Sequence, residues 1–278
     1  MEILPEHSNY KAVYCDIVHR CNMECANCYL PNRNFPDMDT ARLINFIDQF
    51  VNPTEFRFIG GEPTLHKDLD KIIAHATKKN HRTSIATNGL KIANKKYLKK
   101  LRDSGLKTVY LSMTGFDNND IYELTDLARC AKGKMKALDN IIDLNLRLSV
   151  GCIIHKNLNE HLIQKIFEYL KFKNCKAGTS IEFRNIGHIG RYSDNKSYTF
   201  EELKQLVKKS LNIDSFKILE DNEYSFAIVF KGFRINLTNW EGVSEGFNGQ
   251  TNSARGRMTE DFKVAPFLEH IKENEGGY

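Results

Sequence analysis

Residues 12–29, AVYCDIVHRCNMECANCY, combine a strand-like run with three cysteines directly after it. The first seven residues of this stretch are mostly apolar or β-branched, as in a strand buried in a sheet. Cys21, Cys25 and Cys28 follow at CxxxCxxC spacing. Because the three thiols belong to one loop, they can converge on a single metal centre at the edge of the sheet.

Further apolar runs recur along the chain, and amphipathic segments separate them. The predicted strands are residues 12–18, 55–59, 83–87, 108–113, 146–154 and 179–184. Between them, residues 41–50, 69–79 and 162–172 repeat apolar side chains at the three- and four-residue spacing of amphipathic helices. This alternation predicts an α/β fold with a parallel sheet, a partial (β/α)6 TIM-like barrel. Functional sites in such folds form at the carboxyl ends of the strands.

The pattern changes after Tyr192. A helical run over residues 199–211 precedes two alternating segments over 224–240, which predict a hairpin that turns at Lys231-Gly232. After a polar loop, the closing segment 258–274 has a helical pattern around Pro266. We therefore expect a C-terminal α+β extension.

Length and composition fit this organisation. The chain has 278 residues, of which 41% are hydrophobic, enough for a core barrel over 11–192 and an extension over 193–278 on the substrate side or closing the barrel. The net charge of +5 suits an anionic substrate, although it is too weak to diagnose nucleic-acid binding, which stays open. No apolar run approaches the ~18 residues of a membrane helix, and the N-terminus lacks the apolar run of a signal peptide. We expect a cytoplasmic protein without a membrane partner.

The cysteine count favours a metal centre over disulfides. Seven is an odd number, and three of the seven crowd into one short loop. The others, Cys15, Cys130, Cys152 and Cys175, are scattered, and we expect them to be small buried apolar residues.

Two metal centres are compatible with the triplet. Iron–sulfur clusters usually take four cysteines, so a three-cysteine loop leaves one iron open to an exogenous molecule. The alternative is structural zinc with His19 or His66 as fourth ligand. Structural zinc sites usually pair their cysteines in two separated knuckles, and the sequence has no second knuckle, which favours the cluster.

The cysteine loop resembles that of the radical S-adenosylmethionine (SAM) superfamily. The resemblance implies a [4Fe–4S] cluster whose open iron is chelated by SAM, and a 5′-deoxyadenosyl radical that abstracts hydrogen from substrate. It also implies an electron donor such as flavodoxin or ferredoxin. Members often carry an aromatic residue before the third cysteine, where this chain has Asn27; Tyr29 is the residue we expect to cover the adenine.

Gly60-Gly61-Glu62-Pro63 follows the second predicted strand and is similar to the family's GGEP motif. Two glycines let the backbone approach a ligand closely, and a carboxylate can accept hydrogen bonds from an ammonium group. The resemblance implies that this segment holds the amino group of SAM. The alternative interpretation is an ordinary turn with a helix N-terminal cap.

Weaker motifs follow the next three strands. Thr87-Asn88-Gly89 is similar to a TNG element of the family, and Ser112 lies where relatives place a polar SAM contact. An Asn-Gly turn with a positive backbone angle explains the first equally well. Ile153 lies in a segment that resembles an adenine-bordering element, which lacks its second glycine because His155 stands there. We expect His155 to be a strand-end residue.

Three C-terminal features are candidates for substrate contact. Residues 182–192 gather polar and basic groups after the sixth strand, and Arg255-Gly256-Arg257 can present two guanidiniums to a phosphate or carboxylate. A solvated connection is the alternative for residues 182–192, whereas for Arg255-Gly256-Arg257 a solvated loop is the default expectation. We expect Trp240 to anchor the hairpin.

The sequence therefore predicts a radical SAM enzyme with one cluster, since no cysteine follows Cys175. A small molecule, cofactor precursor or nucleotide is the favoured substrate, and a peptide-modifying maturase is the alternative. A zinc-stabilised nucleic-acid-binding module is the alternative of another class. It is disfavoured because no basic stripe with interleaved aromatics is present. Catalytic residues beyond the cluster are not predicted.

Overall fold

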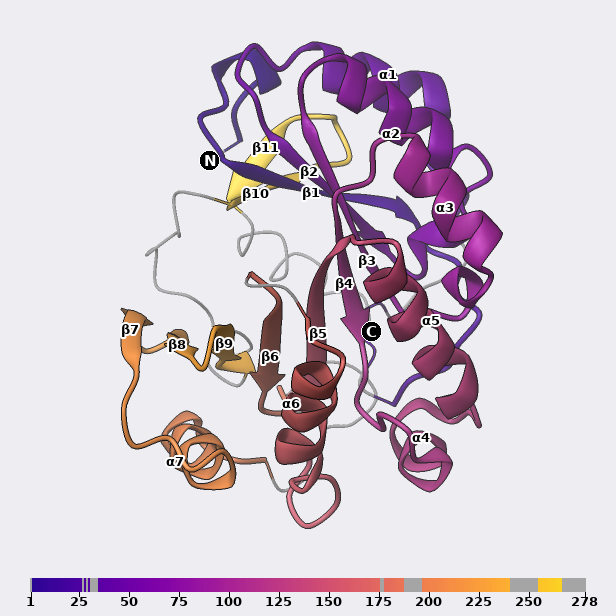
Figure 1. The fold of residues 1–278 in the computed structure, drawn as a ribbon. Helices are drawn as coiled ribbons and strands as arrows, with labels where there is room; N and C mark the ends of the chain where they lie inside the picture. Colours follow the sequence, from indigo (N-terminus) through magenta and orange to yellow (C-terminus); the bar gives the residue numbers. More distant parts are fainter. Residues whose placement is uncertain are drawn as a thin grey trace.

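The computed structural model describes residues 2–26, 28, 30, 35–175, 178–187, 197–240 and 255–266. Its strands form one sheet in the order β11-β10-β1-β2-β3-β4-β5-β6-β9-β8-β7 (Figure 1). The six central strands are parallel. They are β1 (Ala12–Val18), β2 (Glu55–Gly60), β3 (Arg82–Thr87), β4 (Thr108–Ser112), β5 (Arg147–Ile153) and β6 (Ser180–Arg184). Each differs from its predicted range by no more than one residue at either end, so the six predicted strands are confirmed.

Helices cover one face of this sheet (Figure 1). They are α1 (Thr40–Asp48), α2 (Leu69–Lys78), α3 (Lys95–Asp103), α4 (Asn119–Asp126), α5 (Ala131–Asp143) and α6 (Leu162–Phe172), with the short 3-10 turns η1 (Pro5–His7), η2 (Pro63–Leu65) and η3 (Lys91–Ala93). Side-chain caps begin several of them: Asp39 accepts a hydrogen bond from the Arg42 amide at the start of α1. The core lies between these helices and the sheet, where Phe46 of α1 packs edge-on against Phe56 of β2.

The C-terminal part of the chain extends one edge of the sheet. After α7 (Phe200–Ser210), which Thr199 and Glu202 cap reciprocally, come β7 (Lys217–Asp221), β8 (Ser225–Phe230) and β9 (Phe233–Thr238). Strands β8 and β9 form the predicted hairpin, whose turn residues Lys231 and Gly232 both have positive φ. Strand β9 then pairs with β6 in parallel, so the hairpin continues the central sheet.

The opposite edge is extended by β10 (Arg255–Met258), which pairs with β1 in parallel, and by β11 (Val264–Pro266). The predicted helix over 258–274 is therefore wrong for residues 258–266. The local pattern of Met258 and the charges after it allows a helix, but the free edge of β1 offers backbone partners that a helix could not use. Pro266 is tolerated because it ends an edge strand. Residues 267–274 lie outside the described part.

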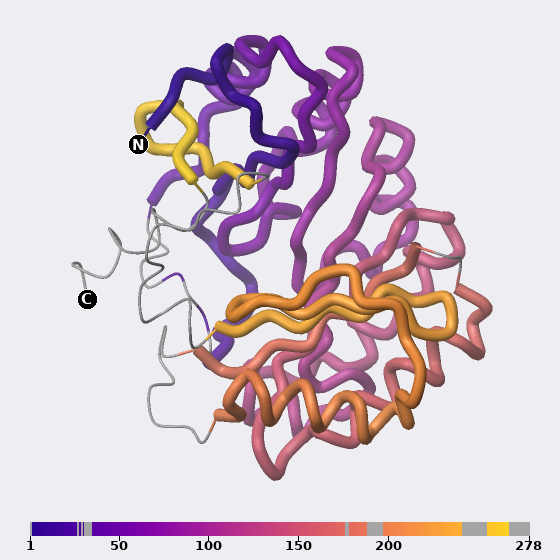
Figure 2. The backbone as a smooth tube through the Cα atoms, turned by 90° about the vertical axis from the view of Figure 1, so that its left-hand side faces the viewer, coloured from indigo at the N-terminus to yellow at the C-terminus, as the bar shows by residue number. Residues whose placement is uncertain are grey.

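The sheet stays open, as expected for a partial barrel, because no described strand joins β11 to β7. Figure 2 shows the two additions apart, with β10 and β11 beside the N-terminus and the hairpin beside α7. Side chains alternate along the central strands: Phe56 and Phe58 face the helices, whereas Glu55 and Arg57 face the opposite side. We call that side the inner face. No helix among the described residues is long and apolar enough to cross a membrane.

Candidate functional site

The cysteine loop begins where β1 ends, at the carboxyl end of the sheet. Its backbone is tied to the fold, because the Ala26 amide donates to the Thr125 carbonyl at 2.9 Å. The guanidinium of Arg20 binds both carboxylate oxygens of Asp37, at 2.8 and 2.6 Å. Two attachments to distant segments hold the loop in one place before any metal binds.

Cys21, Cys25 and Cys28 form no disulfide and are half-buried. Burial raises the pKa of the Cys25 thiol to about 12, and Asp126 and the two other cysteines add to the rise, whereas Lys134 lowers it. The mutual effect means that the three sulfurs share one neighbourhood. Among the described residues no three His, Cys, Asp or Glu side chains converge as closely as a single ion requires.

The two motif glycines face the cysteine loop. A Cβ built on Gly61 would lie 2.3 Å from the Arg20 carbonyl oxygen, and one on Gly60, whose φ is +126°, would lie 2.1 Å from that of Val18. Without a Cβ at either position the two backbones come close enough to bond, and the Gly61 amide donates to Val18 O at 2.7 Å. The Glu62 amide donates to Arg20 O at 2.9 Å. The glycines therefore serve the contact between two backbone segments.

The Glu62 carboxylate is fully buried and bonded within the protein. It accepts from the Thr64 amide as the N-terminal cap of η2, and from the Thr64 hydroxyl at 2.5 Å. It also accepts from the Thr87 hydroxyl and the Asn88 amide, both at 2.7 Å. The cap interpretation of this motif is thus observed, and Pro63 occupies the first position of η2.

The TNG element meets the cysteine loop through Asn88. The Asn88 Nδ2 lies 2.7 Å from Asn22 Oδ1 and 3.8 Å from Cys21 Sγ, while its Oδ1 accepts from the Leu90 amide at 3.0 Å. Gly89 has a φ of +90°, so the positive backbone angle that an Asn-Gly turn serves is present as well.

Ser112 and Ile153 end β4 and β5 at the same edge of the sheet, with Ser112 exposed and Ile153 half-buried. His155 is buried just past β5, and burial lowers its pKa to about 4, which suits the expected strand-end residue. Tyr29 and Asn27 lie outside the described residues.

Lys134 is a neighbour of the site that sequence reasoning missed. It is 1% exposed, donates to the Ser112 carbonyl at 3.0 Å and lies 3.5 Å from Asp126. Its ammonium also lies over the Tyr122 ring. A lysine in an amphipathic helix is expected on the solvent-exposed side, so nothing in the local sequence indicates that Lys134 is buried.

The inner face of the sheet carries a second polar network, formed by side chains of the strands themselves. The Arg57 guanidinium bonds to the hydroxyls of Tyr14 and Tyr110 and forms an ion pair with Glu55 at 3.2 Å. Arg257 pairs with Asp16 at 2.7 Å. Sequence reasoning missed all of these except Arg257, although polar residues at alternate positions of the first two strands could have marked the face.

Glu182 and Arg184 face the same space from β6, 2.8 Å apart. Burial opposes ionisation of Glu182, but Arg184, with Arg255 and Arg57 further away, outweighs it and holds its pKa at about 2. Three arginines therefore act on this one carboxylate.

The predicted substrate segments have separate outcomes. Residues 188–192 lie outside the described part, whereas Asn185 binds the Trp240 amide at 2.6 Å and so ties the end of the hairpin to β6. Trp240 thus lies where an anchor was expected, with Arg184 over its ring. The expected solvated loop at 255–257 is wrong, because these residues form β10 and Arg257 is buried.

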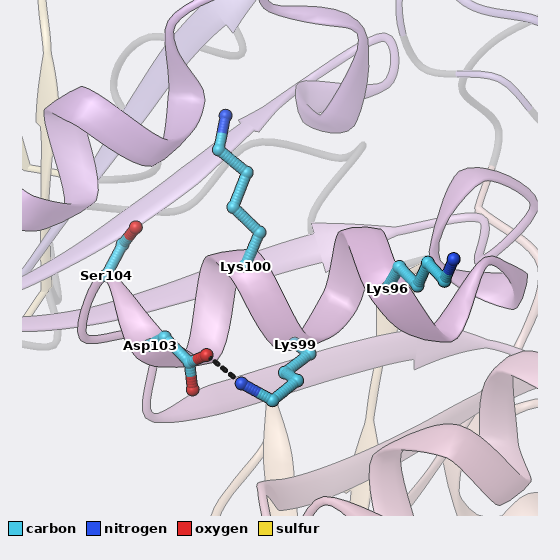
Figure 3. Close-up of a pocket in the computed structure, with 5 residues that line it drawn as sticks. All are labelled: Lys96, Lys99, Lys100, Asp103 and Ser104. Carbon is cyan, nitrogen blue, oxygen red and sulfur yellow. Dashed lines mark hydrogen bonds and ion pairs between the residues drawn. The ribbon is translucent and has the colours of Figure 1, made fainter.

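Two other features can be set apart from the site. His66, a candidate zinc ligand, has both ring nitrogens engaged, by the Met38 carbonyl and the Asp68 amide. A basic depression on α3, lined by Lys96, Lys99, Lys100, Asp103 and Ser104, contains none of the motif residues (Figure 3).

Comparison with known proteins identifies related chains. Residues 16–170 match the family model of the Radical SAM superfamily. The GTP 3′,8-cyclases of Staphylococcus aureus strains JH9 and Newman are each 25% identical over 211 residues, which are 71% of this chain and 61% of the relative. The chain thus spans about three fifths of the length of these relatives.

Solved structures share the fold. Streptococcus suis SuiB bound to S-adenosylmethionine matches 93% of this chain and 60% of its own, with a TM-score of 0.67 and 16% identity. Native anSMEcpe with bound AdoMet and Cp18Cys peptide matches 72% of this chain and 58% of its own, with a TM-score of 0.58 and 20% identity. At these identities the likeness concerns architecture alone.

Proposed function

The chain belongs to the radical SAM superfamily, and from this premise we propose that it reductively cleaves S-adenosylmethionine at a [4Fe–4S] cluster held by Cys21, Cys25 and Cys28. Enzymes of the family use this cluster and SAM. One observation carries the proposal: a single loop presents three cysteines outside any disulfide, and both the GGEP and the TNG segments bond to that loop. When bound, the cluster supplies the electron that cleaves SAM to the 5′-deoxyadenosyl radical.

The residues around the loop would bind and orient SAM. We propose that the segment Gly60–Pro63 holds the amino group of SAM. Glu62 Oε2 accepts one printed hydrogen bond, from the Asn88 amide, so it can also accept from an ammonium group. The Thr87 hydroxyl donates to Glu62 and accepts from the Gly89 amide, so its role is to hold the turn.

The adenosine side of SAM would lie along the ends of β4 and β5. The exposed hydroxyl of Ser112 can bond to SAM, and Ile153 offers an apolar border for the adenine, with Tyr29 as its cover. The family's need for a reductant implies an electron donor, which we propose to be a flavodoxin or ferredoxin.

We propose an anionic small molecule as substrate, a nucleotide or a cofactor precursor. On the inner face, Arg57, Arg184 and Arg257 pair with Glu55, Glu182 and Asp16. Arg255 adds a further positive charge near Glu182. Arg57 Nε and Asp16 Oδ1 are buried without a hydrogen-bond partner in the described structure, which leaves a donor and an acceptor for a ligand. The related GTP 3′,8-cyclases support the nucleotide class.

The extension over 193–278 would form the substrate-side walls. Strand β9 brings Thr238 within 3.2 Å of Glu182, and β10 brings Arg257 to Asp16. We propose a domain boundary near residue 192, between the SAM-binding part and the extension that would complete the inner face.

Anaerobic reconstitution with iron and sulfide tests the reaction. We expect a brown protein with a [4Fe–4S] EPR signal on reduction, and release of 5′-deoxyadenosine when SAM is added. Replacing Cys21, Cys25 or Cys28 with Ala should abolish both the signal and the release, whereas Cys175→Ala should keep both. Colourless protein with tightly bound zinc would contradict the proposal.

Substrate class is tested by its effect on this release. GTP, ATP and a panel of peptides are added separately, and we expect hydrogen abstraction, read as deuterium transfer into 5′-deoxyadenosine, from a nucleotide only. Transfer from a peptide alone would instead support a maturase.

A further inference from the structure

We propose that the Asn88 carboxamide donates a hydrogen bond to Cys21 Sγ and thereby raises the reduction potential of the cluster that Cys21 would ligate. This inference rests on the proposed function. It assigns Asn88 a positioning and tuning role through the cysteine, separate from the direct SAM contact that its motif suggests.

The geometry provides one donor hydrogen for each of two acceptors. The Nδ2 atom lies 2.7 Å from Asn22 Oδ1 and 3.8 Å from Cys21 Sγ, the longer distance matching the larger radius of sulfur. A side-chain amide carries two N–H groups, so both contacts can be made at once. Two neighbouring residues of the cysteine loop are thus held by one side chain.

The orientation of the amide is fixed by its other end. Asn88 Oδ1 accepts from the Leu90 amide at 3.0 Å. A flipped amide would set its NH2 group against that N–H and lose the bond, so the NH2 group has to face the cysteine loop. The donor direction toward Cys21 therefore follows from the turn itself.

The support behind Asn88 is rigid. Its backbone amide donates to the buried Glu62 carboxylate at 2.7 Å, and the Glu62 amide donates to Arg20 O, next to Cys21, at 2.9 Å. Glu62 is therefore bonded to the Asn88 backbone and to the residue before Cys21, which places the two backbone segments next to each other.

The electrostatic consequence has a definite sign. A hydrogen bond to a thiolate stabilises negative charge on the sulfur. The reduced cluster carries one more negative charge than the oxidised cluster, so the bond is stronger after reduction. Hydrogen bonds to the sulfurs are among the factors that set the potentials of such clusters. The Asn88 bond should accordingly ease reduction.

A potentiometric titration followed by EPR tests this. Asn88→Ser keeps an oxygen that can accept from the Leu90 amide and removes the N–H donors; we expect a more negative midpoint potential at unchanged iron content. Asn88→Asp should shift the midpoint further in the same direction, because it adds a negative charge. Asn52→Asp, which makes the same exchange in the exposed loop before β2, should leave the midpoint where it is.

A midpoint in Asn88→Ser equal to that of the unaltered protein would overturn the inference, as would a loss of iron without any shift. If the variants bind no cluster, the hydrogen bond can still be tested in the unaltered protein. When the protein is labelled with ¹⁵N at its asparagine side-chain amides, pulsed EPR of the reduced cluster should show a ¹⁵N coupling. The absence of a coupling would reject the hydrogen bond. Absence of a [4Fe–4S] cluster in the unaltered protein would instead refute the proposed function.

Discussion

The Thr87 hydroxyl donates a hydrogen bond of 2.7 Å to the Glu62 carboxylate, which joins the turn after β3 to the turn after β2. The same carboxylate accepts from the Asn88 amide, so one buried charge holds two motifs in a fixed relation. Residues 25 positions apart in the chain thus depend on a single acceptor group.

Replacing this acceptor should destabilise the fold. In Glu62→Gln one oxygen becomes an NH2 group that cannot accept, so a buried N–H or O–H loses its partner at a cost of about 1–3 kcal/mol. Urea unfolding of the cluster-free protein measures the loss. The exposed Glu201→Gln serves as the control, and equal unfolding midpoints for the two variants would contradict a bracing role.

Gly61→Ala should disturb the cysteine loop. The added Cβ would meet backbone oxygens of Arg20 and His19 at 2.3 and 2.4 Å, and backbone cannot yield as a side-chain tip can. We expect reconstituted Gly61→Ala to bind far less iron per chain. Gly133→Ala in α5, where the nearest atom is the flexible tip of Leu90 at 3.3 Å, should bind iron normally.

The Glu182–Arg184 pair predicts an acid-dependent loss of stability. The folded pKa of Glu182 is about 2, below its ordinary 4.5, so its contribution is complete above about pH 5 and disappears as the pH falls toward 2. The shift corresponds to on the order of 3 kcal/mol. Denaturant unfolding of cluster-free protein across this range should show a shallower pH dependence in Glu182→Gln than in the unaltered protein; parallel curves would refute the assignment.

Lys134 and Asp126 should behave as a coupled buried pair. Lys134→Met leaves the Asp126 carboxylate, which is also buried, without its cation, and removing one partner of such a pair costs about 3–5 kcal/mol. The double variant Lys134→Met with Asp126→Asn should recover part of that loss. A double-mutant cycle on unfolding free energies checks the coupling, and additive effects would show that the two groups act independently.

The sequence predicted those parts of the fold that local pattern controls. Strand β1 and its neighbours carry buried β-branched runs between turn residues, so their limits could be placed within one residue. The segment after Arg255 could not, because its strand form depends on pairing with β1, far away in the chain. Short charged stretches allow helix and strand alike, and a remote partner decides between them.

The residues of the candidate site, too, fall into those that a local sequence motif predicts and those that only tertiary contacts reveal. The cysteine triplet, GGEP and TNG are sequence motifs, and the structure brings all three together. That Glu62 bonds to Thr87, or that Lys134 is buried, depends on contacts between elements whose packing no local window contains. Arg57 is an intermediate case, because polar alternation along its strand could have marked the inner face but not its tyrosine partners.

The pairing of Ala12 with Arg255 has a consequence for biosynthesis. Ribosomal synthesis proceeds from the N-terminus, so β1 and its cysteine loop emerge long before their β10 partner exists. Until then one side of β1 exposes unpaired backbone groups, and Asp16 lacks Arg257. A nascent chain halted before residue 255 would therefore hold its metal-binding loop on an unprotected edge, which makes this interval the one in which a chaperone or an early-bound cluster would matter most.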